Sequence, residues 1–170
     1  MACDGSGTHS FKENYSGTCL HKTSKNGLTN YSHAVLEAKL VTQEGFCLSL
    51  ASQWIENGTE GFDKQDCETK AFKRLSEKIK TLYPDLPIIL VADALYCTLP
   101  VIEIAVQNNW DYMLVIKDGV QKNLNKEISL RPDIKPLTFE EAKVSYLGEL
   151  ELGEHNLNYL KWEGLSNRFS

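Results

Sequence analysis

The first half of the chain alternates between apolar and polar residues in two neighbouring segments. Alanine and leucine occupy every second position between residues 31 and 42, and phenylalanine and leucine do so between residues 46 and 51. A period of two is typical of half-buried strands. Because residues 43–45 (Gln-Glu-Gly) can form a turn, the pattern predicts a β-hairpin. Residues 12–30 are polar and are predicted to form a loop or an exposed ribbon.

The spacing of apolar residues then changes from two to three and four. Between residues 68 and 82 it is that of an amphipathic helix whose other faces carry lysine, arginine and glutamate. Asp63 or Asp66 can cap the start of this helix by accepting backbone N–H bonds. Tyr83 and Pro84 end it.

Two continuous apolar runs follow, at residues 87–93 and 112–116. Such runs are typical of strands buried on both faces. Between them, Thr98 can cap a helix that ends at Asn108, so the segment is predicted to form a βαβ unit with a right-handed crossover.

The C-terminal part of the chain is more mixed. We expect a short helix around residues 119–129, a loop containing Pro132 and Pro136, and two peripheral antiparallel strands at 143–152 and 156–162. The order of all elements predicts an α/β fold. It has a mixed five-stranded sheet, three antiparallel strands then a parallel βαβ unit, flanked by helices and followed by a partial C-terminal β insertion. This is the ribonuclease-H-like topology.

Length and charge restrict the function less than the pattern does. The 170 residues fit one domain. The net charge of -5 argues mildly against a nucleic-acid binder. No apolar run approaches the ~20 residues that span a bilayer, so no membrane association is expected. Five cysteines without a CxxC pair and the absence of a signal peptide predict reduced thiols and a cytoplasmic protein.

Three acidic residues are candidates for chemistry. Asp93 ends a buried strand, where ligands of open α/β sheets bind, and Asp4 begins the segment Asp4-Gly-Ser-Gly7. Glu68 extends the apolar stripe of its helix instead of lying among the lysines. Each has a structural alternative: Asp93 and Asp4 as turn residues, and Glu68 as a first-turn acid that interacts with the helix N-terminus.

Carboxylates that converge at strand ends would bind Mg²⁺ or Mn²⁺, because hard cations prefer oxygen ligands. Two such ions can activate a water or a hydroxyl for phosphoryl transfer. Lys70, Arg74 and Lys78 form a basic stripe that could contact a DNA backbone or simply be solvated, and Lys117 leaves the same two choices open.

Two other constellations are weaker. Cys19, His21 and His33 do not have a recognised zinc-ligand spacing, and no fourth ligand is evident. The segment from Asp4 to Thr8 could be a phosphate-binding turn of an actin-like nucleotide-binding module, although no P-loop lysine follows it.

Residues 31–119 carry motifs that resemble the catalytic domain of DDE transposases of bacterial insertion sequences, and Asp4-Gly-Ser-Gly7 resembles the segment with that family's first catalytic aspartate. The motifs are Tyr31-Ser-His33, Lys64-Gln-Asp-Cys-Glu68, Ala71-Phe-Lys-Arg-Leu75, Asp93-Ala-Leu-Tyr96, Trp110 and Val115-Ile-Lys117.

The resemblance implies a Mg²⁺- or Mn²⁺-dependent nuclease and strand transferase that acts on transposon ends and target DNA. Asp4 and Asp93 would be catalytic and metal-binding, Glu68 a further catalytic acid by analogy with ribonuclease H, and Lys70, Arg74 and Lys117 DNA-binding.

The family's third acid has no match, so residues 1–170 are expected to be one catalytic domain truncated at both ends, with its core at 1–130 and part of the β insertion at 131–170. Full-length relatives would form a homodimer. Such a fragment is expected to be inactive in transposition. The alternatives are a remnant that only binds DNA or a partner chain, and the nucleotide-binding module.

Overall fold

The computed structural model describes residues 1–42, 44–58, 64–117, 122–133, 135–139, 142–152 and 155–163. The chain divides into two compact units, residues 1–116 and 117–170. Each unit is described by itself.

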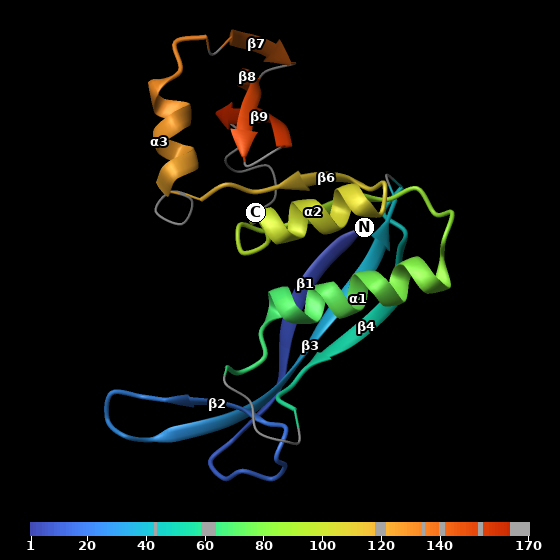
Figure 1. Ribbon diagram of the computed structural model, residues 1–170, viewed down its shortest axis with the longest axis vertical. Helices are drawn as coiled ribbons and strands as arrows, with labels where there is room; N and C mark the ends of the chain where they lie inside the picture. Colours follow the sequence, from blue (N-terminus) through green and yellow to red (C-terminus); the bar gives the residue numbers. More distant parts are fainter. Residues whose placement is uncertain are drawn as a thin grey trace. The chain divides into compact units, whose positions relative to one another are not determined.

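The strands of the first unit form one mixed sheet (Figure 1). They are β1 (Ala2–Phe11), β2 (Leu20–Thr23), β3 (Thr29–Val41), β4 (Cys47–Ile55), β5 (Ile89–Ala92) and β6 (Asp111–Leu114). Their order is β2-β3-β1-β5-β6, and β4 also pairs with β3. Strands β2, β4 and β1 are antiparallel to β3, whereas β1, β5 and β6 are parallel to one another. The α/β fold with antiparallel strands followed by a parallel βαβ unit is therefore present.

Two helices cover one face of this sheet, called here the helix face. They are α1 (Glu68–Leu82) and α2 (Leu99–Gln107), and Figure 1 shows α1 lying across β1, β3 and β4. The buried side of α1 packs with strand residues in one hydrophobic core. The largest fully buried side chains of that core include Tyr96, Phe72, Leu36, Leu75, Ile79 and Leu90. The predicted helix at 68–82 is confirmed at both ends.

The other side of the sheet, called here the second face, is more exposed. Side chains alternate between the two faces along each strand. Leu90 and Ala92 of β5 are buried on the helix face, whereas the intervening Val91 is 44% exposed. Met113, which lies level with Val91 on β6, is 63% exposed.

Several predicted details are wrong. The strand count is wrong: residues 20–23, predicted to form a loop or an exposed ribbon, form the mostly exposed strand β2, so the sheet has six strands instead of five. Asp66 does not cap α1. The N-cap is Cys67, and Asp66 is occupied by Arg74 and the N–H of Glu56. Thr98 stands at the N-cap of α2 but its side chain makes no capping hydrogen bond. The other candidate cap, Asp63, lies outside the described residues.

The second unit contains α3 (Lys122–Leu130), β7 (Lys135–Phe139), β8 (Ala142–Leu152) and β9 (His155–Glu163). The three strands form an antiparallel sheet in the order β7-β8-β9. This confirms the two strands predicted at 143–152 and 156–162. The loop predicted around Pro136 is wrong, because this proline lies in an edge strand, where a missing N–H is tolerated. No helix within the described ranges is long and apolar enough to span a membrane.

Candidate functional site

Asp4 lies in β1 and Asp93 directly follows β5, and these two strands are parallel neighbours. Ala2 of β1 pairs with Val91 of β5. Counting two residues onward on each strand reaches Asp4 and Asp93. If the pairing continued, their α-carbons would be one strand spacing apart, about 4.8 Å. Both carboxylates belong to the second face and both residues are exposed.

Asp93 is also the first residue of a turn. β5 ends at Ala92, and one carboxylate oxygen of Asp93 accepts a hydrogen bond from the N–H of Leu95 at 2.9 Å. The N–H of Tyr96 donates to the Asp93 carbonyl at 3.1 Å. The turn therefore fixes where the strand ends and how the carboxylate is oriented, and the structural role expected for Asp93 coexists with its position beside Asp4.

Glu68 lies on the other side of β1. It is the first residue of α1, and its carboxylate packs against the α-carbon of Gly5. A Cβ at Gly5 would be only 2.6 Å from Oε1 of Glu68. Because Gly5 and Asp4 are consecutive in a strand, their side-chain directions are opposite. Glu68 is therefore on the helix face, as its place on the apolar stripe predicted, and the two aspartates are on the second face.

A buried hydroxyl holds the Glu68 carboxylate in this position. Tyr96 is 1% exposed, and its hydroxyl donates to Oε2 of Glu68 at 2.9 Å. Burial and the negative charge of Glu68 both raise the pKa of Tyr96, with smaller contributions from Cys3 and Asp4. Burial likewise raises the pKa of the Cys3 thiol to about 12. Both groups are therefore neutral at physiological pH, which leaves the negative charge of the region on its carboxylates.

Asp4 and Asp93 belong to the neighbouring strand segments β1 and β5, whereas Glu68 lies on the opposite face of β1. Within the described part of the chain, no three His, Cys, Asp or Glu side chains are grouped so that they could hold a metal ion. A pair of carboxylates still fits Mg²⁺, which keeps several waters and needs only one or two protein carboxylates beside phosphate oxygens.

The predicted basic stripe on α1 connects the helix to neighbouring backbone. Nζ of Lys70 donates to the carbonyls of Lys64 and Gln65, at 3.3 and 3.2 Å, and Nζ of Lys78 donates to the carbonyl of Ser52 at 3.1 Å. Arg74 donates to the Trp54 carbonyl at 3.1 Å. These contacts give the stripe a structural role.

Lys117 belongs to the second unit. Its carbonyl accepts a hydrogen bond from Nδ2 of Asn125 at 3.1 Å. This contact lies within the second unit and does not bear on DNA binding, so the predicted role of Lys117 stays a prediction.

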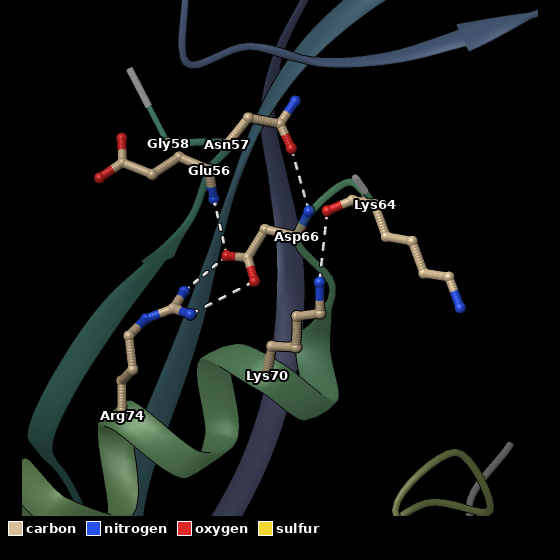
Figure 2. A pocket seen from close by; sticks show the side chains of 7 residues that line it. All are labelled: Glu56, Asn57, Gly58, Lys64, Asp66, Lys70 and Arg74. Carbon is tan, nitrogen blue, oxygen red and sulfur yellow. Dashed lines mark hydrogen bonds and ion pairs between the residues drawn. The ribbon is translucent and has the colours of Figure 1, made fainter. Parts of the chain in front are cut away.

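Asp66 and Arg74 form the centre of a polar pocket of about 250 Å³ (Figure 2). The lining residues are Glu56, Asn57, Gly58, Lys64, Asp66, Lys70 and Arg74. The guanidinium group binds both oxygens of the Asp66 carboxylate, which is only 7% exposed. The N–H of Glu56 donates to the same carboxylate, and the N–H of Asp66 donates to Oδ1 of Asn57. The Asp66 carboxylate at the centre of this pocket is thus satisfied by groups of the chain itself.

The three residues considered for zinc do not form a ligand set. Sγ of Cys19 lies 3.4 Å from Nε2 of His33. The ring of His21 instead lies beside Tyr31, at a centroid distance of 6.2 Å.

Sequence reasoning missed the contacts that orient Glu68. Tyr96 and Gly5 were visible only as parts of motifs, since nothing in the spacing shows that a tyrosine and a glutamate 28 positions apart share a hydrogen bond. It also missed that aromatic and imidazole rings gather on the second face. The signal was present in the unusual number of His, Tyr and Phe residues between positions 9 and 33.

Comparison of the chain with protein-family models, with curated proteins and with solved structures found no match.

Proposed function

We propose that this chain is the ribonuclease-H-like catalytic core of a DDE transposase, which cuts and joins DNA by metal-dependent phosphoryl transfer. The observation that carries this proposal is the parallel pairing of Ala2 with Val91, each of which precedes one of the two aspartates, Asp4 and Asp93, by two residues. The strand order and the motif resemblance support it. The net charge of -5 is compatible with a catalytic core whose main DNA contacts lie elsewhere.

In this proposal Asp4 and Asp93 hold Mg²⁺ or Mn²⁺ between them. The ions supply an activated water or hydroxyl nucleophile and stabilise the leaving oxygen. In this proposal the chain's own contribution is positional: the parallel pairing of β1 with β5 sets the spacing of the two carboxylates, and the N–H of Leu95 orients that of Asp93. Glu68 acts from the opposite face of β1 as a fixed negative charge that Tyr96 orients.

The test is a titration with Mn²⁺ in which electron paramagnetic resonance measures the concentration of the free ion. Asp4→Asn and Asp93→Asn should each weaken Mn²⁺ binding about tenfold or more, because each removes a charged ligand while keeping the shape. Asp85→Asn, in an exposed turn before β5, is the matched control and should bind as the wild type does. Equal binding by all four proteins would contradict the proposal.

Glu68→Gln belongs in the same series. If Glu68 is a positioning residue on the helix face, this variant keeps most of its Mn²⁺ affinity. A loss equal to that of Asp4→Asn would instead make Glu68 a ligand. Nicking of a supercoiled plasmid by the same proteins in Mn²⁺ then connects metal binding to DNA cleavage.

A second candidate function is a remnant that associates with DNA or with another transposase chain without cleaving DNA. It is favoured by the fact that no third acid joins the two aspartates among the described residues. Nicking by the wild-type chain that Asp4→Asn abolishes would exclude it. DNA binding without nicking, at saturating Mn²⁺, would favour it over the catalytic proposal.

A further inference from the structure

The sheet of the first unit extends beyond the region that α1 covers. The extension, called here the arm, consists of residues 8–33: the end of β1, the following loop, β2 and the start of β3 (Figure 1). β3 is long enough to pair with β2 at residues 29–32 and with β4 at residues 34–41. Antiparallel pairing with β1 continues along both parts, as far as Phe11 and Tyr31.

One side of this region carries two groups of neighbouring rings, called here together the ring strip. It consists of His9, Phe11, His21, Tyr31, His33 and Trp54. The ring of His9 stacks on that of Phe11, and His33 lies edge-on to both Phe11 and Trp54, at centroid distances of 6.0 and 6.4 Å. Trp54 is 49% exposed.

The strand registers place the ring strip on the second face, the face of Asp4 and Asp93. Asp4 lies level with Glu37 on β3, and Val35, two residues earlier, lies level with Ser6 and with Trp54. The next alternate residue of β3 is His33, which therefore belongs to the same face.

On β1 the alternation shifts by one position. The register changes between Gly7 and His9, so that His9 pairs with His33 and Phe11 with Tyr31. This irregularity turns the rings of β1 toward the second face as well. From Asp4 to Phe11 the strip and the carboxylates span about 20 Å, at ~3.3 Å per residue.

The charge of the arm differs from that of the rest of the chain. The arm holds three lysines, Lys12, Lys22 and Lys25, against one acid, Glu13, and it holds three of the four histidines. The whole chain is acidic, with a net charge of -5. Lys22 follows His21 in β2 and therefore belongs to the opposite face, so the basic charge is a property of the arm as a whole. A locally basic arm that also carries exposed rings, those of His9, His21 and Trp54, has two features that bind unpaired nucleic acid: attraction for the phosphates and faces on which bases stack.

We propose that the ring strip binds the unpaired bases of a DNA end and leads that strand along the second face toward Asp4 and Asp93. This inference rests on the proposed function, and it adds that the substrate at this surface is single-stranded. Base stacking on the strip does not depend on a metal ion, so binding can be measured without the reaction.

The test uses fluorescence anisotropy of a labelled DNA duplex in EDTA, with the whole 170-residue chain. One duplex is blunt, and the other carries a single-stranded overhang of about eight nucleotides, a length within the range that one binding domain occupies. The overhang should bind about tenfold more tightly than the blunt duplex. Trp54→Ala and His9→Ala should each remove a large part of this preference, because one stacked base contributes ~5- to 100-fold.

Phe46→Ala is the matched control. Phe46 is also an exposed aromatic residue, 58% exposed, but it lies in the turn between β3 and β4, at the end of that hairpin away from the strip. This variant should bind both duplexes as the wild type does. His9 is exposed, so His9→Ala is expected to fold normally, and thermal unfolding of each variant checks this.

The proposal is overturned if the two duplexes bind equally, or if Phe46→Ala loses as much affinity as Trp54→Ala. It is also overturned if the strip variants keep full DNA affinity while sedimentation shows that they abolish a dimer, since the strip would then be an interface between copies. Asp4→Asn separates the two proposals. It should keep the overhang preference in EDTA even if Mn²⁺ binding and nicking show that the carboxylates are not a metal site.

Discussion

The carboxylate of Glu68 occupies the space that a side chain at position 5 would need, so Gly5 and Glu68 are packed as one unit across the join of β1 and α1. The contact requires a residue without a Cβ, and it places the first turn of α1 directly against the segment that carries Asp4. Tyr96 completes the arrangement from the turn after β5. Three separate motifs of the sequence therefore meet at one carboxylate.

We predict that Gly5→Ala lowers the free energy of unfolding by about 1–3 kcal/mol. The added methyl displaces the Glu68 carboxylate and leaves the buried Tyr96 hydroxyl without its acceptor. Urea denaturation measures the change. Gly7→Ala is the matched control, because no atom lies within 4 Å of a Cβ at that position of the same strand.

A double-mutant cycle shows whether the effect passes through Glu68. If it does, Gly5→Ala should cost less in a Glu68→Ala background than in the wild type, with a coupling of about 0.5–3 kcal/mol. Additive costs would place the strain elsewhere, for instance in the backbone of β1.

Tyr96→Phe should destabilise the chain by about 1–2 kcal/mol while leaving the core volume nearly unchanged. The substitution removes only the hydroxyl that donates to Glu68, and a hydrogen bond to a charged group typically contributes that much. Chemical denaturation at neutral pH gives the value. Tyr112→Phe is the control, because it removes a hydroxyl from a half-buried position on β6. An equal loss of stability in this variant would mean that the hydrogen bond to Glu68 contributes no more than any other tyrosine hydroxyl.

Stability should fall as the pH rises from about 9 to 12, and Cys3 should be one cause. Burial raises the pKa of the folded Cys3 thiol from 9.0 to about 12. Between these values the unfolded chain loses the proton first, so ionisation favours unfolding and the contribution of this group is complete only below pH 9. Cys3→Ala should flatten the dependence of the unfolding free energy on pH, whereas Cys47→Ala, at an exposed position, should not.

Arg74→Ala should lower the free energy of unfolding by about 2–3 kcal/mol. The change leaves the Asp66 carboxylate, only 7% exposed, without its cation. Lys73→Ala, at the preceding exposed position of α1, should change stability by less than about 0.5 kcal/mol. Thermal unfolding of the two variants in parallel tests this, and similar values would mean that Asp66 is adequately solvated.

Cys67 should be alkylated by iodoacetamide faster than Cys47 at neutral pH. Burial by itself would raise the pKa of Cys67. Hydrogen bonds from the Thr69 side chain and from the N–H groups of Lys70 and Thr69 outweigh it, so the pKa of this thiol is lowered. Thiolates are the reactive form. Mass spectrometry of peptides after brief labelling gives the order, and labelling of Cys47 before Cys67 would contradict it.

Long and strongly periodic segments were predictable from the sequence, whereas short polar strands were not. Helix α1 begins and ends where its apolar spacing predicts, because that spacing is sustained over 15 residues. β2 has only four residues, three of them exposed, and it forms because β3 offers a free edge. Pro136 indicated a loop, and only the pairing of the C-terminal strands shows that β7 can accept it at an edge.

The candidate site was predictable in part for a similar reason. That Asp93 would end a buried strand can be deduced from the local apolar pattern. The contact of Glu68 with Gly5 depends on where α1 docks on the sheet, which many distributed side chains decide together. The same holds for Arg74, whose basic side chain suggested an external ligand while the fold provides an internal one in Asp66.

The irregularity between Gly7 and His9 has a consequence for how the gene can change. The irregularity absorbs one extra residue of β1, Thr8, so His9 and Phe11 stay on the side of the sheet that Asp4 occupies. Removal of Thr8 would give a regular ladder and leave both rings on that same side, because His9 would then follow Gly7 as His33 adjoins Ala34. A three-nucleotide deletion of the Thr8 codon should therefore leave both faces of this strand as they are.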